Sequence, residues 1–274
     1  MKLDPVLLNM ACSWSKKAYR EEYVDDCIKI ENKWTSTTAL IAKRESIDII
    51  AFRGTQQKID VLTDLCVIPV WYAGRLCHGG FALAHKSIWK QILPHIDPNK
   101  RTLITGHSLG GGLSEISAAL LMQQNKVNNK KDNKVNNKKD NKENNNIYKN
   151  INVITFGKPN VFFKGFKRPM DLDTQLSVIN HCDSVARIPR LCYGPSTSQQ
   201  VLYFGGNGLN HIDPSKEFKK EDRKLGEIKE RATDHYIDNY KKRLKDFLEE
   251  QDKILNEDEI KELNKMADEV ENEK

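Results

Sequence analysis

The run Gly106-His107-Ser108-Leu109-Gly110, followed by Gly111 and Gly112, constrains the fold more than any other part of the sequence. It comes directly after the apolar residues 102–105 and opens a helical pattern over 109–124. A serine at a tight turn from strand to helix has a strained backbone, and the flanking glycines leave room for it. The pentapeptide also arises by chance in glycine-rich turns, but its place between a strand and a helix favours Ser108 as a nucleophile.

Apolar runs alternate with amphipathic stretches along the rest of the chain. Strands that alternate with helices are typical of a mostly parallel sheet with helices on both faces. The sequence therefore predicts one α/β domain over residues 1–250. We expect strands at 38–42, 47–52, 102–105, 151–156 and 175–180, and helices at 5–20, 81–93, 109–124 and 237–250.

Two segments lack this pattern. Residues 126–149 are rich in Asn and Lys and contain KVNNKKDN twice, at 126–133 and 134–141. Such a tract buries no apolar surface, so we expect a disordered insertion between a helix and the next strand, where extra length costs little entropy. Residues 251–274 carry nine acidic residues and four Lys. They predict a charged, solvated tail, with a helix that packs on the body or on another chain as the alternative.

The net charge of +6 does not indicate a nucleic-acid-binding protein. Nucleic acid requires basic residues gathered on one face, whereas the densest group here lies in the Asn/Lys tract. No apolar run approaches the ~18 residues of a membrane-spanning helix, so no transmembrane segment is expected. Asp4 makes the N-terminus a poor signal peptide, and the six cysteines form no CxxC pair. These features predict an intracellular, cytoplasmic location.

A serine hydroxyl needs a base that is itself oriented by a third group. In the α/β-hydrolase fold, which the elbow at Ser108 indicates, the acid and then the histidine follow the serine in the chain. Asp183 comes just after the apolar run at 175–180 and is a candidate acid, although a residue there is often only a cap or turn. Two histidines follow it. His235, directly before the last amphipathic helix, is favoured over His211, which lies in a turn-like stretch of a long loop.

Several ordered motifs together resemble the class 3 lipases, the family of fungal triacylglycerol lipases and related plant acylhydrolases. The resemblance covers roughly residues 5–250 apart from the Asn/Lys tract, and the order of the motifs makes coincidence a poor explanation. The matching segments are Ala51-Phe52-Arg53-Gly54-Thr55, Cys77-His78-Gly79-Gly80-Phe81, Thr105 to Gly111, Thr155-Phe156-Gly157-Lys158-Pro159, Asn180 to Pro189, and Asp234-His235 with Tyr240.

The resemblance implies an α/β-hydrolase fold and a Ser108–Asp183–His235 triad. It also implies an oxyanion hole made by the amides of Thr55 and Leu109, with help from the Thr55 hydroxyl. Lipid esters would be cleaved through an acyl-enzyme, with no metal and no organic cofactor. The stretch 56–65 would take the position of the family's short lid helix, but it lacks the usual aromatic residue.

The substrate remains open at this stage. A lipid or another ester, met at a membrane or lipid-droplet surface, is the expected partner. Ala186 in place of the usual Pro, and Gly112 with Glu115 in the elbow helix, depart from the family's pattern. A phospholipase, acyltransferase or peptidase would share the same triad, and a non-catalytic interaction protein on a lipase scaffold is the alternative from another class. Trp71 and Tyr72 are expected in the core, with an acyl pocket as the other possibility.

Overall fold

A computed structural model describes most of the chain. The expected lid position at 56–65 and most of the acidic tail lie outside the described residues. Across the described part, no helix has both the length and the apolar character needed to cross a membrane. The described residues are 3–20, 26–55, 68–135, 148, 150–164, 170, 172–189, 192–194, 199–226 and 233–254.

A mixed sheet of eight strands, in the order β1-β2-β3-β6-β7-β9-β11-β12, forms the centre of the molecule. Its five middle strands are parallel, and antiparallel strands complete both edges. The predicted α/β-hydrolase architecture with a mostly parallel sheet is confirmed. The parallel strands are β3 (Ile47–Phe52), β6 (Arg101–His107), β7 (Ile151–Phe156), β9 (Thr174–Asn180) and β11 (Gln200–Phe204), and the edge strands are β1 (Cys27–Asn32), β2 (Thr37–Lys43) and β12 (Asn210–Ile212).

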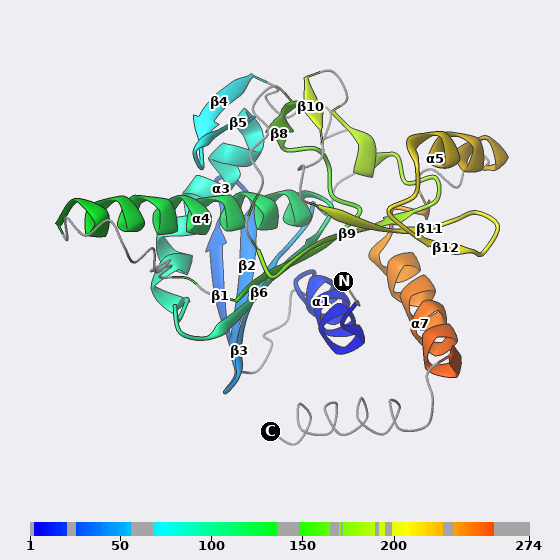
Figure 1. Cartoon of the computed structure of the whole chain (residues 1–274), viewed down its shortest axis with the longest axis horizontal. Helices are drawn as coiled ribbons and strands as arrows, with labels where there is room; N and C mark the ends of the chain where they lie inside the picture. Colours follow the sequence, from blue (N-terminus) through cyan, green and yellow to red (C-terminus); the bar gives the residue numbers. More distant parts are fainter. Residues whose placement is uncertain are drawn as a thin grey trace.

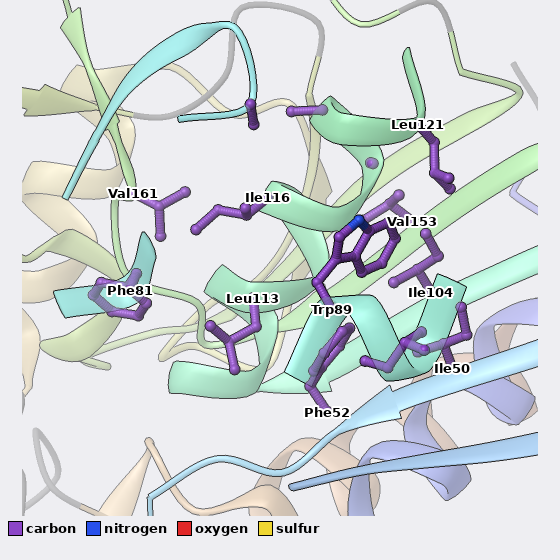
Figure 2. Close-up of a cluster of buried hydrophobic side chains, with 14 of the residues drawn as sticks. Ile50, Phe52, Phe81, Trp89, Ile104, Leu113, Ile116, Leu121, Val153 and Val161 are labelled. Atoms are coloured by element: carbon purple, nitrogen blue, oxygen red, sulfur yellow. The ribbon is translucent and has the colours of Figure 1, made fainter. Parts of the chain in front are cut away.

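Helices cover both faces of this sheet (Figure 1). Successive strand residues point to opposite faces, so Ile50 and Ile104 pack beneath α3 (Gly79–Ile92) and α4 (Leu109–Val135), together with Phe81 and Trp89 (Figure 2). Their neighbours Ile49 and Leu103 belong to the other core, beneath α1 (Pro5–Lys17) and α7 (Ile237–Ile254). Burial of both faces explains why the strands read as continuous apolar runs.

A second sheet of four short strands, in the order β10-β8-β5-β4, was not predicted. Strands this short carry no periodic signal. Two of them follow the carboxyl ends of β7 and β9, so this sheet lies at the carboxyl edge of the parallel strands. Trp71 is 57% exposed there, which corrects its expected place in the core. The strands are β4 (Pro69–Tyr72), β5 (Arg75–His78), β8 (Phe162–Phe163) and β10 (Tyr193–Gly194).

The elbow helix is longer than predicted. α4 continues through 126–135, so the first part of the Asn/Lys tract is helical rather than disordered. A helix that is already nucleated adds residues at little cost, and this favours propagation into a polar segment that has no Gly or Pro. Residues 136–147 lie outside the described part. At the other end, α7 runs to Ile254 and takes in the first residues of the acidic tail.

The remaining helices are short. α5 (Lys216–Asp222) begins with Ser215, whose hydroxyl accepts the Phe218 amide, as an N-cap serine does. Three single turns complete the described helices: η1 (Leu93–His95), η3 (Val185–Arg187) and η4 (Arg223–Leu225).

Candidate active site

Ser108 lies at the turn between β6 and α4 in a strained conformation. Its φ is +57°, a left-handed value that costs a non-glycine residue roughly 1–2 kcal/mol. The turn is also closely packed: a Cβ on Gly106 would lie 2.4 Å from the carbonyl carbon of Gly110, and a Cβ on Gly110 would lie 2.2 Å from the carbonyl oxygen of Phe52. The glycines therefore allow backbone contacts that no side chain permits, and the turn presents the serine hydroxyl beyond the strand.

The structure brings Ser108, His235 and Asp183 together. The Ser108 hydroxyl lies 2.8 Å from Nε2 of His235, and Nδ1 of the same ring lies 2.9 Å from Oδ2 of Asp183. All three side chains are buried. The histidine stands just before α7, whose packing on the sheet anchors it, and the aspartate follows β9.

Asp183 is surrounded by hydrogen-bond donors. Its Oδ1 accepts the amides of Val185 and Ala186 at 2.8 and 3.3 Å, and its Oδ2 accepts the Tyr240 hydroxyl at 2.6 Å. Burial, and then the Asp183 charge, hold the pKa of Tyr240 well above its ordinary value, so this hydroxyl remains a donor. Asp183 therefore has both of the roles considered from the sequence: one carboxylate oxygen caps its own turn, and the other faces His235.

These contacts determine the tautomer of His235. A carboxylate that receives donors on both oxygens acts as an acceptor, so Nδ1 of His235 carries the proton. In the neutral ring Nε2 is then unprotonated and accepts the Ser108 hydroxyl. Gly157 makes this possible at φ +54°, because a Cβ there would lie 2.6 Å from Oδ2 of Asp183.

A second histidine, His107, is hydrogen-bonded to the backbone of His235. Nε2 of His107 lies 2.5 Å from the carbonyl oxygen of His235, and a carbonyl only accepts, so this nitrogen donates. Nδ1 then accepts the Tyr19 hydroxyl at 2.7 Å. Burial, followed by the neighbouring His235, holds the pKa of His107 well below its ordinary value, which keeps the ring neutral in this arrangement.

No feature of the sequence predicts a role for Tyr19 at the site. The tyrosine follows α1 and is 88 residues away from His107 in the chain. Its hydroxyl is hydrogen-bonded by the backbone of Gly54, and a Cβ on Gly54 would lie 2.0 Å from it. One hydroxyl thus joins the loop after β3 to the residue before Ser108. No local pattern signals such a contact.

The two predicted oxyanion donors, Thr55 and Leu109, belong to segments that meet at the elbow. Gly54, the residue before Thr55, touches the elbow, because a Cβ there would lie 2.6 Å from the carbonyl oxygen of His107. Leu109 is the first residue of α4, and the first amides of a helix have no acceptor within it. Their positive end favours an anion. The role of the two amides as oxyanion donors stays a prediction.

The alternative base, His211, is elsewhere. It belongs to β12, where it pairs with Tyr203, and its ring centroid lies 4.2 Å from that of Phe218. The expected turn-like stretch is in fact an edge strand. His211 therefore packs beneath α5, whereas the Ser108 hydroxyl meets His235.

One group of described side chains has the composition of a metal site: His181, Cys182 and Asp234, whose ligand atoms lie within 4.8 Å of one another. Its polar atoms already have protein partners. Nε2 of His181 lies 3.0 Å from the carbonyl oxygen of Asp222 and so carries a proton, and Asp234 Oδ2 accepts the Cys182 amide at 2.8 Å. We assign the group a structural role, which is to hold Asp234 one residue before His235.

Glu115, one of the departures from the family's pattern, has a buried partner. Its Oε2 lies 3.0 Å from Nζ of Lys158, and both side chains are almost fully buried. Gln175 donates to the other oxygen of Glu115 at 3.3 Å. Lys158 follows Gly157, so this charged pair links the elbow helix to the loop that makes room for the triad.

Comparisons with known proteins agree on family and fold. The family model described as Lipase (class 3) matches residues 49–192, more than half of the 274 residues. No curated protein sequence matches the chain. Among solved structures, a lipase from Rhizopus microsporus var. chinensis is 19% identical with a TM-score of 0.62, and 85% of each chain is covered.

Two further fungal enzymes superpose in the same way. A Rhizomucor miehei triacylglyceride lipase is 17% identical with a TM-score of 0.57, and the match covers 76% of this chain and 81% of the lipase. A Penicillium expansum triacylglycerol lipase is 15% identical with a TM-score of 0.58, covering 83% of this chain and 91% of the lipase. At such identities the structural likeness shows a shared fold.

Proposed function

The chain belongs to the class 3 lipase family, and we propose on this premise that it hydrolyses carboxylic esters of lipids with Ser108 as its nucleophile. One observation carries the proposal: a buried chain of hydrogen bonds of 2.8 and 2.9 Å runs from the Ser108 hydroxyl through His235 to Asp183. The tautomer that these bonds require leaves Nε2 of His235 free to take the serine proton.

In the first half of the reaction, Oγ of Ser108 attacks the ester carbonyl carbon while His235 takes its proton. The negative charge that develops on the carbonyl oxygen is stabilised by the amides of Thr55 and Leu109. His235 then gives the proton to the leaving alcohol as the carbon–oxygen bond of the ester breaks. The acyl group remains on Ser108.

In the second half, water attacks the acyl carbon and His235 accepts its proton. Collapse of this intermediate releases the carboxylic acid, and the proton returns to Oγ of Ser108. Asp183 holds the imidazole in position throughout and stabilises the imidazolium form. Tyr240, bonded to the same carboxylate oxygen as His235, keeps Asp183 aligned.

Acylglycerols are the first substrates to test. The support is the family and the fold shared with enzymes described as triacylglycerol or triacylglyceride lipases. p-Nitrophenyl esters of increasing chain length, assayed beside monoacylglycerol, triacylglycerol and phospholipid, would define the acyl and head-group preference. An enzyme that prefers phospholipid would keep the proposed chemistry but change the proposed substrate.

A fluorophosphonate probe tests the chemistry directly, because it labels a serine only when an adjacent base activates it. We expect covalent labelling at Ser108 and none in Ser108→Ala. That variant should also lose esterase activity by roughly 10⁵–10⁶-fold, since the triad works as one unit. Unlabelled wild-type protein with normal folding, or a Ser108→Ala variant with near-normal turnover, would disprove the proposal.

A further inference from the structure

Several large apolar side chains are exposed near one edge of the molecule. Trp34, in the turn between β1 and β2, is 80% exposed, and Ile68, just before β4, is 66% exposed. Leu83 on α3 is 51% exposed. A soluble protein usually hides such residues or uses them for contact when they gather.

Hydrogen bonds place these residues along one helix. The Gly79 amide at the start of α3 donates to the carbonyl oxygen of Ile68 at 3.0 Å. Leu83 lies one helical turn further on, and Ser87 lies one turn beyond it. The Ser87 hydroxyl is 2.8 Å from that of Thr35, the residue after Trp34. A line of contacts therefore runs along α3 from β4 to the turn between β1 and β2.

The outward face of α3 adds positive charge to this line. At 100° per residue, Leu83, Lys86 and Lys90 share the side of the helix opposite Phe81. Phe81 and Trp89 point into the core (Figure 2). Lys86 and Lys90 are exposed, as is Lys33 beside Trp34. We call the area formed by Lys33, Trp34, Ile68, Leu83, Lys86 and Lys90 the α3 surface.

Acidic residues are absent from the segments that build this surface. None occurs from Ile68 to Ile96, and none occurs over 32–44, although the whole chain has 38 Asp and Glu in 274 residues. The described neighbours of Lys86 and Lys90 on α3 therefore include no carboxylate that would neutralise them. The α3 surface combines exposed apolar groups with lysines whose own helix carries no acidic residue.

The α3 surface also lies near the edge at which Ser108 is presented. Ala39 pairs with Phe52, and the Arg53 amide donates to the carbonyl oxygen of Thr38, so β2 begins where β3 ends. The turn that carries Trp34 is thus at the carboxyl edge of the parallel strands. The small sheet that contains β4 is at the same edge (Figure 1).

We propose that the α3 surface docks on an anionic lipid bilayer. Tryptophan favours the interface between water and lipid, exposed Ile and Leu side chains enter the acyl region, and lysines attract anionic head groups. The delivery of ester substrate from the bilayer to Ser108 rests on the proposed function, whereas the binding itself does not.

Sedimentation of the full chain with vesicles tests the proposal. We expect stronger binding to phosphatidylcholine vesicles that contain 30% phosphatidylglycerol than to phosphatidylcholine alone, and weaker binding as salt is raised. Lys86→Glu/Lys90→Glu should reduce binding to the anionic vesicles by about 25-fold, since each lysine near such a surface contributes roughly fivefold. Trp34→Ala should weaken binding to both kinds of vesicle.

A matched control is available on α7. Lys241 and Lys245 are exposed and have the same spacing of four residues, so Lys241→Glu/Lys245→Glu should bind vesicles like the wild type. All variants should hydrolyse a soluble short-chain ester at the wild-type rate, which separates docking from chemistry. Equal binding to neutral and anionic vesicles, no vesicle binding at all, or an equal loss in the α7 control would overturn the proposal.

Discussion

The two ends of α4 belong to one helix but obey different constraints. At the elbow end, Gly110, Gly111 and Gly112 lie where a Cβ would come to within 2.2–2.7 Å of a neighbouring atom. At the far end, residues 126–135 are rich in Asn and Lys and continue the helix away from the sheet (Figure 1). The first half is dictated by tertiary packing around Ser108, and the second follows from propagation of a helix already formed.

The elbow end of α4 positions the catalytic serine, whereas the far end should accept changes in sequence. Glycine is a poor helix former, yet three in a row open α4, because close backbone contact there outweighs helix propensity. Substitutions should therefore matter steeply near the elbow and hardly at all at the far end.

Gly110→Ala should give the largest effect. Its Cβ would lie 2.2 Å from the carbonyl oxygen of Phe52, and neither backbone can move without disturbing the elbow. We expect a loss of about 3 kcal/mol in unfolding free energy and loss of esterase activity, measured by urea denaturation and by turnover of a soluble ester. Gly208→Ala is the control: it meets no atom within 4 Å at φ +81°, so it should cost only roughly 1–2 kcal/mol and keep activity.

The Tyr19→Phe variant tests whether catalysis at the elbow depends on contacts from outside α4. Without the hydroxyl, Nδ1 of buried His107 loses its donor, at a cost of about 1–3 kcal/mol. We expect kcat to fall about tenfold with KM little changed. His107 would hold the backbone of His235 less firmly, while the residues that contact the substrate stay the same. Tyr236→Phe, at a tyrosine that is 61% exposed, should leave both constants unchanged. A Tyr19→Phe enzyme with normal kcat would remove Tyr19 from the site.

His85 makes the packed half of α4 sensitive to acid. Its Nε2 lies 2.8 Å from the Ser117 hydroxyl, and burial lowers its pKa to about 3. The unfolded chain binds a proton near pH 6.5 and the folded chain does not, so stability falls as the pH drops below that value. His85 alone should make unfolding about 1.4 kcal/mol easier at pH 5.5 than at pH 7.5. Urea titrations of His85→Gln at both pH values should show a smaller difference by that amount.

Deletion of 126–146 should have the smallest effect. Asn125 and Tyr148 stay in place: the Asn125 side-chain amide donates to the carbonyl oxygen of Tyr148 and its Oδ1 accepts the Tyr148 amide, both at 2.9 Å, which closes the gap at the base of the tract. We expect wild-type kcat and an unfolding midpoint within experimental error. Loss of activity in a variant that still folds would show that the far end of α4 has a function of its own.

Long apolar segments could be predicted from the sequence, and for one reason. β7 has the predicted bounds, 151–156. All six of its residues are buried because helices cover both faces of the sheet, and such a strand is mostly apolar along its whole length. The short strands of the second sheet and β12 could not be found in this way. They have only two to four residues, too few for a periodic pattern, and β8 pairs with β5 and β10 from distant parts of the chain.

The site divides along a similar line. Ser108 could be identified locally because its strained turn requires glycines around it. The choice between His235 and His211 depended on an argument about order and anchoring, which the contact with the serine hydroxyl now supports. Tyr19 and the buried Glu115–Lys158 pair could not be foreseen, since each joins segments far apart in the chain and neither residue type indicates burial.

The pair of bonds between Asn125 and Tyr148 has an evolutionary consequence. When the two ends of an inserted segment are held together, each doubling of its length costs only about 0.6 kcal/mol in closure entropy. Copies of the unit KVNNKKDN, which occurs twice in tandem, can therefore be added or removed with little effect on stability. Selection on catalysis would be nearly blind to such changes, and strains should differ in repeat number while the hydrolase core stays constant.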